Sequence, residues 1–165
     1  MNEIVIGGVN ASISIVNIGN FCPSWINIFG LVIVILLLLP NIIYEMKFHE
    51  IGNKCKNKTM NIIEQIGRYS SMFLMIFNIG VAEFGFSLAE VFIIYFVGNT
   101  FLMIAYWIIW GLYFKKRVLW RSMVLAIIPT VIFLLSGITL RHYLLVISAI
   151  VFGIGHIYVT YQNVK

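Results

Sequence analysis

Six polar side chains lie within or beside long apolar stretches of this chain, where such groups are costly and therefore informative. They are Asn78, Glu83, Asn99, Arg141, His142 and His156. Amide, imidazole and charged groups in such places either hold helices together by hydrogen bonds or line a path for ions and small molecules. We treat these six as candidate ligand contacts or as a polar path, and weigh each against a structural role.

Three of the six are predicted to share one end of the molecule. Glu83 closes one apolar stretch, while Arg141 and His142 form the turn between two later stretches. An ion pair between Glu83 and Arg141 would create a vestibule or a ligand-binding cluster at that end. The alternative is that Arg141 and His142 are ordinary residues of an interfacial turn and that Glu83 is a surface charge.

The other three candidates fall deeper in the apolar stretches. His156 follows Gly153-Ile154-Gly155, and small residues allow a neighbouring helix to come close. We therefore expect His156 to hydrogen-bond to that neighbour, with a proton relay as the alternative. Asn78 and Asn99 lie near the middle of two adjacent stretches, so we expect them to face each other. If instead they face a cavity together with His156, they form a polar path.

The sequence lacks the short motifs by which common enzyme active sites and metal sites are recognised. There is no aspartate, no His-Glu-x-x-His, no Cys-x-x-Cys and no Gly-x-Ser-x-Gly. A metal site requires three or four ligands that converge, and the spacing of the candidate ligands along this chain does not suggest such a group. We expect a protein that is not an enzyme and that holds no metal and no cofactor.

The elements that must position these residues follow from composition. Of the 165 residues 61% are hydrophobic and only 10% are charged, and the mean hydropathy is +1.00. A soluble domain is about one quarter charged, so we predict an integral membrane protein. Five runs are long and apolar on all sides, which predicts helices rather than strands. The expected fold is an all-α bundle of five transmembrane helices within 25–165, with spans at about 25–44, 69–84, 88–114, 122–140 and 143–161.

Two segments flanking the first span are less regular. Residues 1–24 are apolar but repeatedly interrupted by Asn and Ser, so we expect an extracytoplasmic tail, with a weak sixth span as the alternative. Asn61 and Glu64 are spaced as a helix N-cap and its third residue. They predict a helix that begins there and approaches the second span along the membrane surface.

Basic residues predict the orientation. Ten of the eleven Lys and Arg residues would lie on one side if the spans alternate, and only Arg141 on the other. Basic loops remain cytoplasmic, so the N-terminus is expected outside and the C-terminus inside. The net charge of +5 is then a signature of topology, and no nucleic-acid partner is expected. The Ile-, Lys- and Asn-rich composition is typical of an AT-rich genome, which favours a bacterial plasma membrane.

These features predict function only by class. Almost no part of the chain is expected outside the membrane, and structural roles such as helix packing and capping can account for most of the polar residues. We expect a small non-enzymatic accessory or regulatory subunit whose partners are the lipid bilayer and either other membrane proteins or copies of itself. The alternative is a small-molecule or ion transporter or channel that acts as a homo-oligomer.

Overall fold

The computed structural model describes residues 26–47, 57–79 and 89–164, and every regular element in these ranges is a helix. The helices are α1 (Ile28–Lys47), α2 (Lys58–Ile76), α3 (Ala89–Lys115), α4 (Leu119–Thr139) and α5 (Tyr143–Val164). The all-α prediction is confirmed. The expected tail at 1–24 and Glu83 lie outside the described residues.

Four of these helices, α1, α3, α4 and α5, are long and apolar enough to cross a membrane. Their ends agree with the predicted spans to within three residues. A helix of 20 residues is about 30 Å long, which matches the hydrocarbon thickness of a bilayer. The chain is therefore described as an all-helical protein with four candidate membrane spans.

The predicted span at 69–84 does not match the helix that the structure places there, and the five-span count is not confirmed. Helix α2 begins at Lys58, where the Asn57 side chain accepts a hydrogen bond from the Met60 N–H at 3.3 Å. It ends at Ile76, because Phe77 turns to extended backbone and bridges to Ile26. The predicted surface helix and the start of the predicted span are thus one helix, in which polar and apolar residues alternate up to Ser71 and only the last five residues are uniformly apolar.

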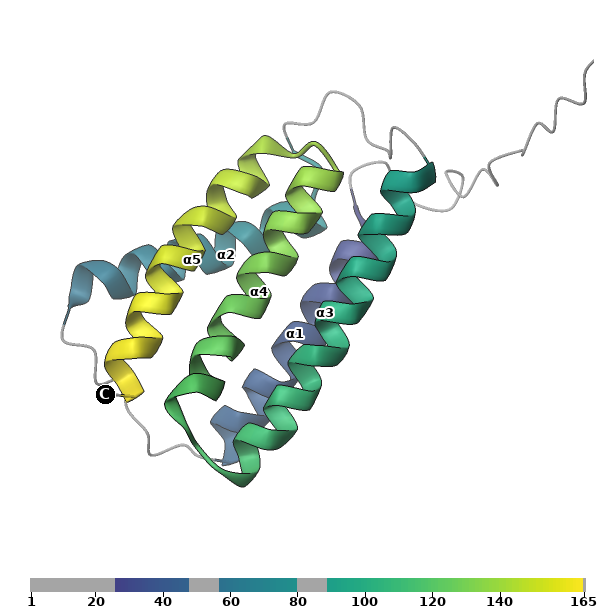
Figure 1. The fold of residues 1–165 in the computed structure, drawn as a ribbon. Coiled ribbons are helices and arrows are strands. Elements are labelled where there is room, and N and C mark those ends of the chain that lie inside the picture. The colour runs from purple at the N-terminus through teal and green to yellow at the C-terminus, as the bar shows by residue number, and fades with distance from the viewer. Residues whose placement is uncertain (1–25, 48–56, 80–88, 165) are drawn as a thin grey trace, which may run out of the picture.

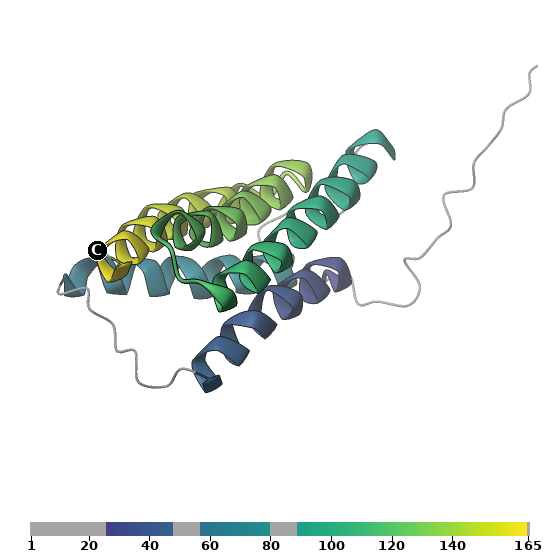
Figure 2. The ribbon, with the colours of Figure 1, turned by 60° about the horizontal axis from the view of Figure 1, so that its bottom comes forward.

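The helices form two layers (Figure 1). Helices α5, α4 and α3 lie side by side in one layer, and α2 and α1 lie behind them, α2 against α5 and α1 against α3. Figure 2 shows the same division from another direction. Consecutive helices run in opposite directions, so α1 and α3 are parallel to each other. In Figure 1, α2 crosses behind α5 obliquely.

The core lies mostly between the layers and is built from large apolar side chains. Fully buried members include Met75, Tyr106, Ile132, Phe133 and Leu145. The rings of Phe133 and Phe152 meet edge to face with centroids 5.8 Å apart, which joins α4 to α5. By contrast, α1 buries only a narrow stripe, formed by Gly30, Val34, Leu37 and Pro40.

Glycines set the closest approach between α2 and α5. A Cβ added to Gly67 would lie 2.5 Å from the Phe152 backbone, and one added to Gly155 would lie 2.7 Å from the Glu64 Cα. Real contacts are never this short, so both positions require glycine for the helices to touch. Small residues bring helices together in this way in membranes, where apolar burial alone gives little driving force.

Gly67→Ala should therefore lower the free energy of unfolding by about 1–3 kcal/mol, as overpacking of a tight contact does. Gly111→Ala is the matched control, because a Cβ there meets nothing within 4 Å. It should be neutral or stabilising by up to about 1 kcal/mol, since alanine favours a helix over glycine. Denaturant titration in detergent micelles measures both. Equal effects of the two changes would contradict this account of the α2–α5 contact.

Candidate functional site

Two groups of polar side chains lie along the contact between α2 and α5, and together we name them the polar seam. It consists of Glu64, Arg68, Ser70 and Ser71 on α2 and of Ser148 and His156 on α5. The eight residues from Ser148 to His156 correspond to about 12 Å along the helix axis. The seam thus extends over two to three turns, with Glu64 and Ser71 buried and Arg68 partly exposed.

The charged end of the seam centres on Glu64, which is only 6% exposed. Its Oε1 is paired with the Arg68 guanidinium one turn further along α2, and it lies 2.8 Å from Nδ1 of His156 on α5. For this contact to be a hydrogen bond to a carboxylate, Nδ1 must carry the proton. The His156 ring also stacks on Phe152, with centroids 4.8 Å apart and an interplanar angle of 17°.

This arrangement follows from the cost of burying a carboxylate. An ionised carboxylate without partners is too costly to bury at such a site. A carboxylate that accepts hydrogen bonds from two donors, one of them positively charged, can remain buried. With a neutral imidazole the three groups sum to zero charge, and with an imidazolium they sum to +1. The Arg68 guanidinium therefore balances the charge of the Glu64 carboxylate, and His156 adds a second hydrogen bond to it.

The hydroxyl end of the seam continues the same contact. The Ser148 Oγ lies 2.6 Å from the Ser70 Oγ and 2.9 Å from the Ser71 Oγ. Ser70 also donates to the Ile66 carbonyl within its own helix. These hydroxyls satisfy one another across the helix contact, which is the usual role of serine between packed membrane helices.

The structure places Asn99 in a different contact from the predicted one. Its side-chain amide lies 3.3 Å from the Ser136 Oγ of α4 and donates to the Tyr95 carbonyl at 2.9 Å. Asn78 lies beyond the end of α2 and so is not near the middle of a span. The expected pairing of Asn78 with Asn99 is therefore replaced by a bond between α3 and α4.

Arg141 and His142 form the turn between α4 and α5, as predicted. Arg141 has φ of 54°, and the N–H groups of Arg141 and His142 donate to the carbonyls of Ile138 and Gly137. This is the Schellman pattern that ends many helices, here with arginine where glycine is commoner. The predicted pair with Glu83 falls outside the described residues. The turn's geometry is that of a helix terminus.

His142 is a buried helix cap. It is 2% exposed, and its Nδ1 accepts a hydrogen bond from the Leu145 N–H at 3.3 Å. Burial lowers the pKa of this imidazole and outweighs the backbone hydrogen bonding that opposes the shift, so the neutral ring is favoured. Within the described residues its Nε2 makes no hydrogen bond.

The candidates therefore occupy separate places. His156 lies in the polar seam, Asn99 between α3 and α4, and Arg141 and His142 at the α4–α5 turn. Among residues whose positions are described, no group of three His, Cys, Asp or Glu side chains is placed to hold a metal ion. The expectation that His156 bonds to a neighbouring helix is met by its contact with Glu64.

Sequence reasoning missed Glu64 and Arg68 as part of this site. Glu64 was interpreted as a surface helix-start residue, and Arg68 only as a topology signal. Their spacing of four residues on one helix face is a signal that could have linked them. Gly67 between them, like Gly155 beside His156, marks the close helix contact that buries the carboxylate.

No family model, no curated protein and no solved structure matches this chain.

The charged end of the seam predicts energetic coupling between Glu64 and His156. His156→Phe keeps an aromatic ring on Phe152 but removes a donor from a buried carboxylate, so it should cost about 1–3 kcal/mol of stability. Glu64→Gln removes the charge. In the double variant the two losses should not add, with a coupling of about 0.5–3 kcal/mol measured by denaturant titration.

The control for this cycle pairs His156→Phe with Asn99→Leu. Asn99 bonds to α4 and shares no partner with His156, so these two losses should add. A Glu64–His156 cycle as additive as the control would show that the hydrogen bond between them contributes no stability.

Proposed function

We propose that the chain is a small non-enzymatic integral membrane protein that works by association, as an accessory or regulatory subunit of a larger membrane assembly. The observation that carries this proposal is the set of hydrogen-bond partners of the polar side chains within the bundle. Glu64 and His156 pair across α2 and α5, Asn99 meets Ser136 across α3 and α4, and His142 caps α5. The first two contacts hold helices together and the third caps a helix, which supports a packing role over a role in a reaction.

The surface of the bundle also supports association. Helices α1 and α3 expose many large apolar side chains, among them Ile35, Ile43, Ile93, Phe101 and Ile108. In a bilayer these faces contact either lipid or the apolar face of another membrane helix. We propose that a partner in the membrane binds to this side, while α2, α4 and α5 form the stable part of the subunit.

The proposed orientation follows from the ends of the helices. Lys47, Lys58, Lys115 and Arg121 lie at one end of the bundle, and Arg141 lies at the other. We place the basic end in the cytoplasm of a bacterial cell and the α4–α5 turn outside. In this arrangement α2 is a fifth, oblique crossing whose charged half is covered by α5.

A transporter or channel acting as a homo-oligomer is the second candidate. It is favoured by one observation, the contact between the ionisable side chains of Glu64 and His156 across α2 and α5, because ionisable groups at membrane depth often mark ion or proton pathways. On this alternative the seam would open between copies of the chain, and the active form would be a symmetric oligomer.

Native mass spectrometry of the protein extracted gently from its own membrane distinguishes the two. An accessory subunit predicts a mass that includes a different chain, and that chain identifies the assembly. Clean multiples of 18.9 kDa alone would contradict the proposal and favour the homo-oligomeric transporter.

A further inference from the structure

The first turn of α5 is capped by a side chain that loses this ability when it gains a proton. Nδ1 of His142 accepts a hydrogen bond from the Leu145 N–H at 3.3 Å, and the His142 carbonyl accepts the first bond of the helix, from the Val146 N–H. A ring nitrogen that accepts cannot carry a proton, so the imidazole in this contact is neutral. Asparagine, which caps α2 as Asn57, makes the same kind of bond without a titrating group.

Three features of the structure oppose the protonated form of His142. An imidazolium carries a proton on both nitrogens, so its Nδ1 would face the Leu145 N–H as a second donor. His142 is 2% exposed, and among the described residues its Nε2 finds no hydrogen-bond partner to offset a buried charge. The ring also lies at the N-terminus of α5 and directly after Arg141, where the helix dipole disfavours a further cation. The charged ring is therefore favoured only after it has left this place.

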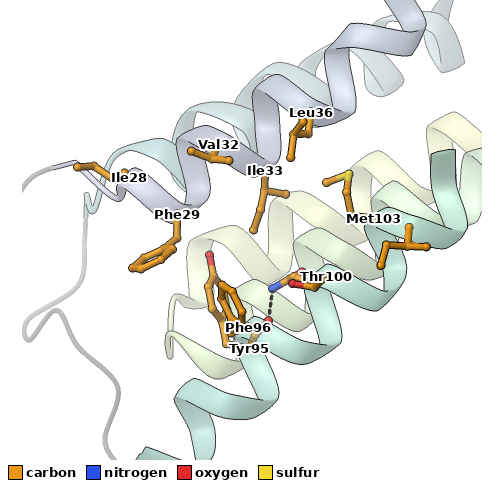
Figure 3. A pocket seen from close by; sticks show the side chains of 11 residues that line it. Ile28, Phe29, Val32, Ile33, Leu36, Tyr95, Phe96, Thr100 and Met103 are labelled. Atoms are coloured by element: carbon orange, nitrogen blue, oxygen red, sulfur yellow. Dashed lines mark hydrogen bonds between the residues drawn. The ribbon is translucent and has the colours of Figure 1, made fainter.

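No described carboxylate pairs with His142 to hold its charged form. The backbone of Phe77, just beyond α2, favours the charged form, but burial has the larger effect on the pKa of the His142 ring. The charged side chains at this end of the described helices and turns are Glu90 and Arg141, and both are exposed. The pocket between α1 and α3 in Figure 3 is lined by apolar and neutral side chains, of which only Tyr95 can ionise, as a phenol does at alkaline pH. Four other ionisable residues of the surrounding helices lie further along them, and these are Glu64 and Arg68 on α2, Arg121 on α4 and His156 on α5.

The position of His142 links its release to the packing of several helices. Its N–H donates to the Gly137 carbonyl at 2.8 Å, which closes the turn from α4 into α5. Its ring lies beside the backbone of Phe77, the residue that ends α2 and bridges to Ile26 just before α1. Departure of the ring thus removes the cap of α5 and a contact between this turn and the end of α2.

We propose that His142 is a pH-sensitive switch at this end of the bundle. The neutral ring caps α5 and keeps the α4–α5 turn closed, and a proton taken from water releases the ring and opens the first turn of α5. In the open turn the ring has its ordinary pKa of about 6.5, and in the closed turn the pKa is lower. The closed turn is therefore fully stable above about pH 6.5 and loses stability as the pH falls below that value.

The side of the membrane on which this switch acts follows from the orientation proposed above. There the α4–α5 turn lies outside the cell, so the switch responds to acidification of the external medium. The switch itself depends neither on that orientation nor on the proposed association.

Hydrogen exchange at the Leu145 amide tests the switch directly, because this N–H donates to the His142 ring. NMR of the full chain in detergent micelles gives the protection factor of the amide, which corrects for the pH dependence of exchange itself. From about pH 7.5 to about pH 5 this factor should fall about three- to thirtyfold. The upper limit applies if the ring binds a proton in the open turn alone. The Ser122 amide, in the first turn of α4, is the internal control and should change less than about twofold.

His142→Asn is the decisive variant, because asparagine caps a helix and does not titrate in this range. Its Leu145 protection factor should change less than about twofold between the same pH values. His156→Phe removes the other histidine of the described helices and should show the same fall as the wild type. A Leu145 factor that does not depend on pH in the wild type would overturn the proposal, and so would an equal fall in His142→Asn.

A second measurement keeps the proposal testable if His142→Asn does not fold. The ¹³C NMR signal of the His142 ring in the wild type is titrated over the same pH range. The signal should titrate below about pH 6.5 and over the interval in which the Leu145 amide loses protection. Titration of the ring without loss of protection would refute the switch.

Discussion

The hydrogen bond between the Glu64 carboxylate and His156 is the interaction on which the arrangement of this bundle depends. It draws a helix with a charged first half against one that is apolar enough to cross a membrane. Gly67 and Gly155 allow the approach, Arg68 balances the charge, and the serines continue the contact. Without this pairing, α2 would have to place a carboxylate in an apolar environment, which is strongly unfavourable.

The need to pair Glu64 explains why some helices pack closely while others keep exposed faces. With α2 fixed on α5, and α5 packed on α4, three helices form a unit that buries most of its polar groups in mutual hydrogen bonds. Helix α3 joins this unit through Asn99 and Ser136, whereas α1 adds only a narrow buried stripe. The parallel pair α1 and α3 therefore retains exposed apolar faces, and this is where we place contacts with other molecules.

Much of the fold could be predicted from sequence, because four spans are long, uniformly apolar and bounded by charged or aromatic residues. The exception was α2. Hydropathy favoured the apolar run after Tyr69, but the helix is set by the Asn57 cap and ends where Phe77 pairs with Ile26. For the site, the glycines beside His156 correctly indicated a close neighbour. Hydropathy could not identify that neighbour as Glu64. In sequence, a buried carboxylate cannot be told from a surface carboxylate until its partner on another helix is known.

The central claim is that α2 lies along α5 in the membrane, and disulfide cross-linking in native membranes tests it most directly. With both natural cysteines replaced by serine, Ser71→Cys and Ser148→Cys should form a cross-link on mild oxidation, since the two hydroxyls are 2.9 Å apart. Ser71→Cys with Ser136→Cys is the control, because Ser136 contacts α3 instead. A rapid cross-link in the first pair alone is the predicted result. Absence of that cross-link, or equal cross-linking in both pairs, would contradict the account.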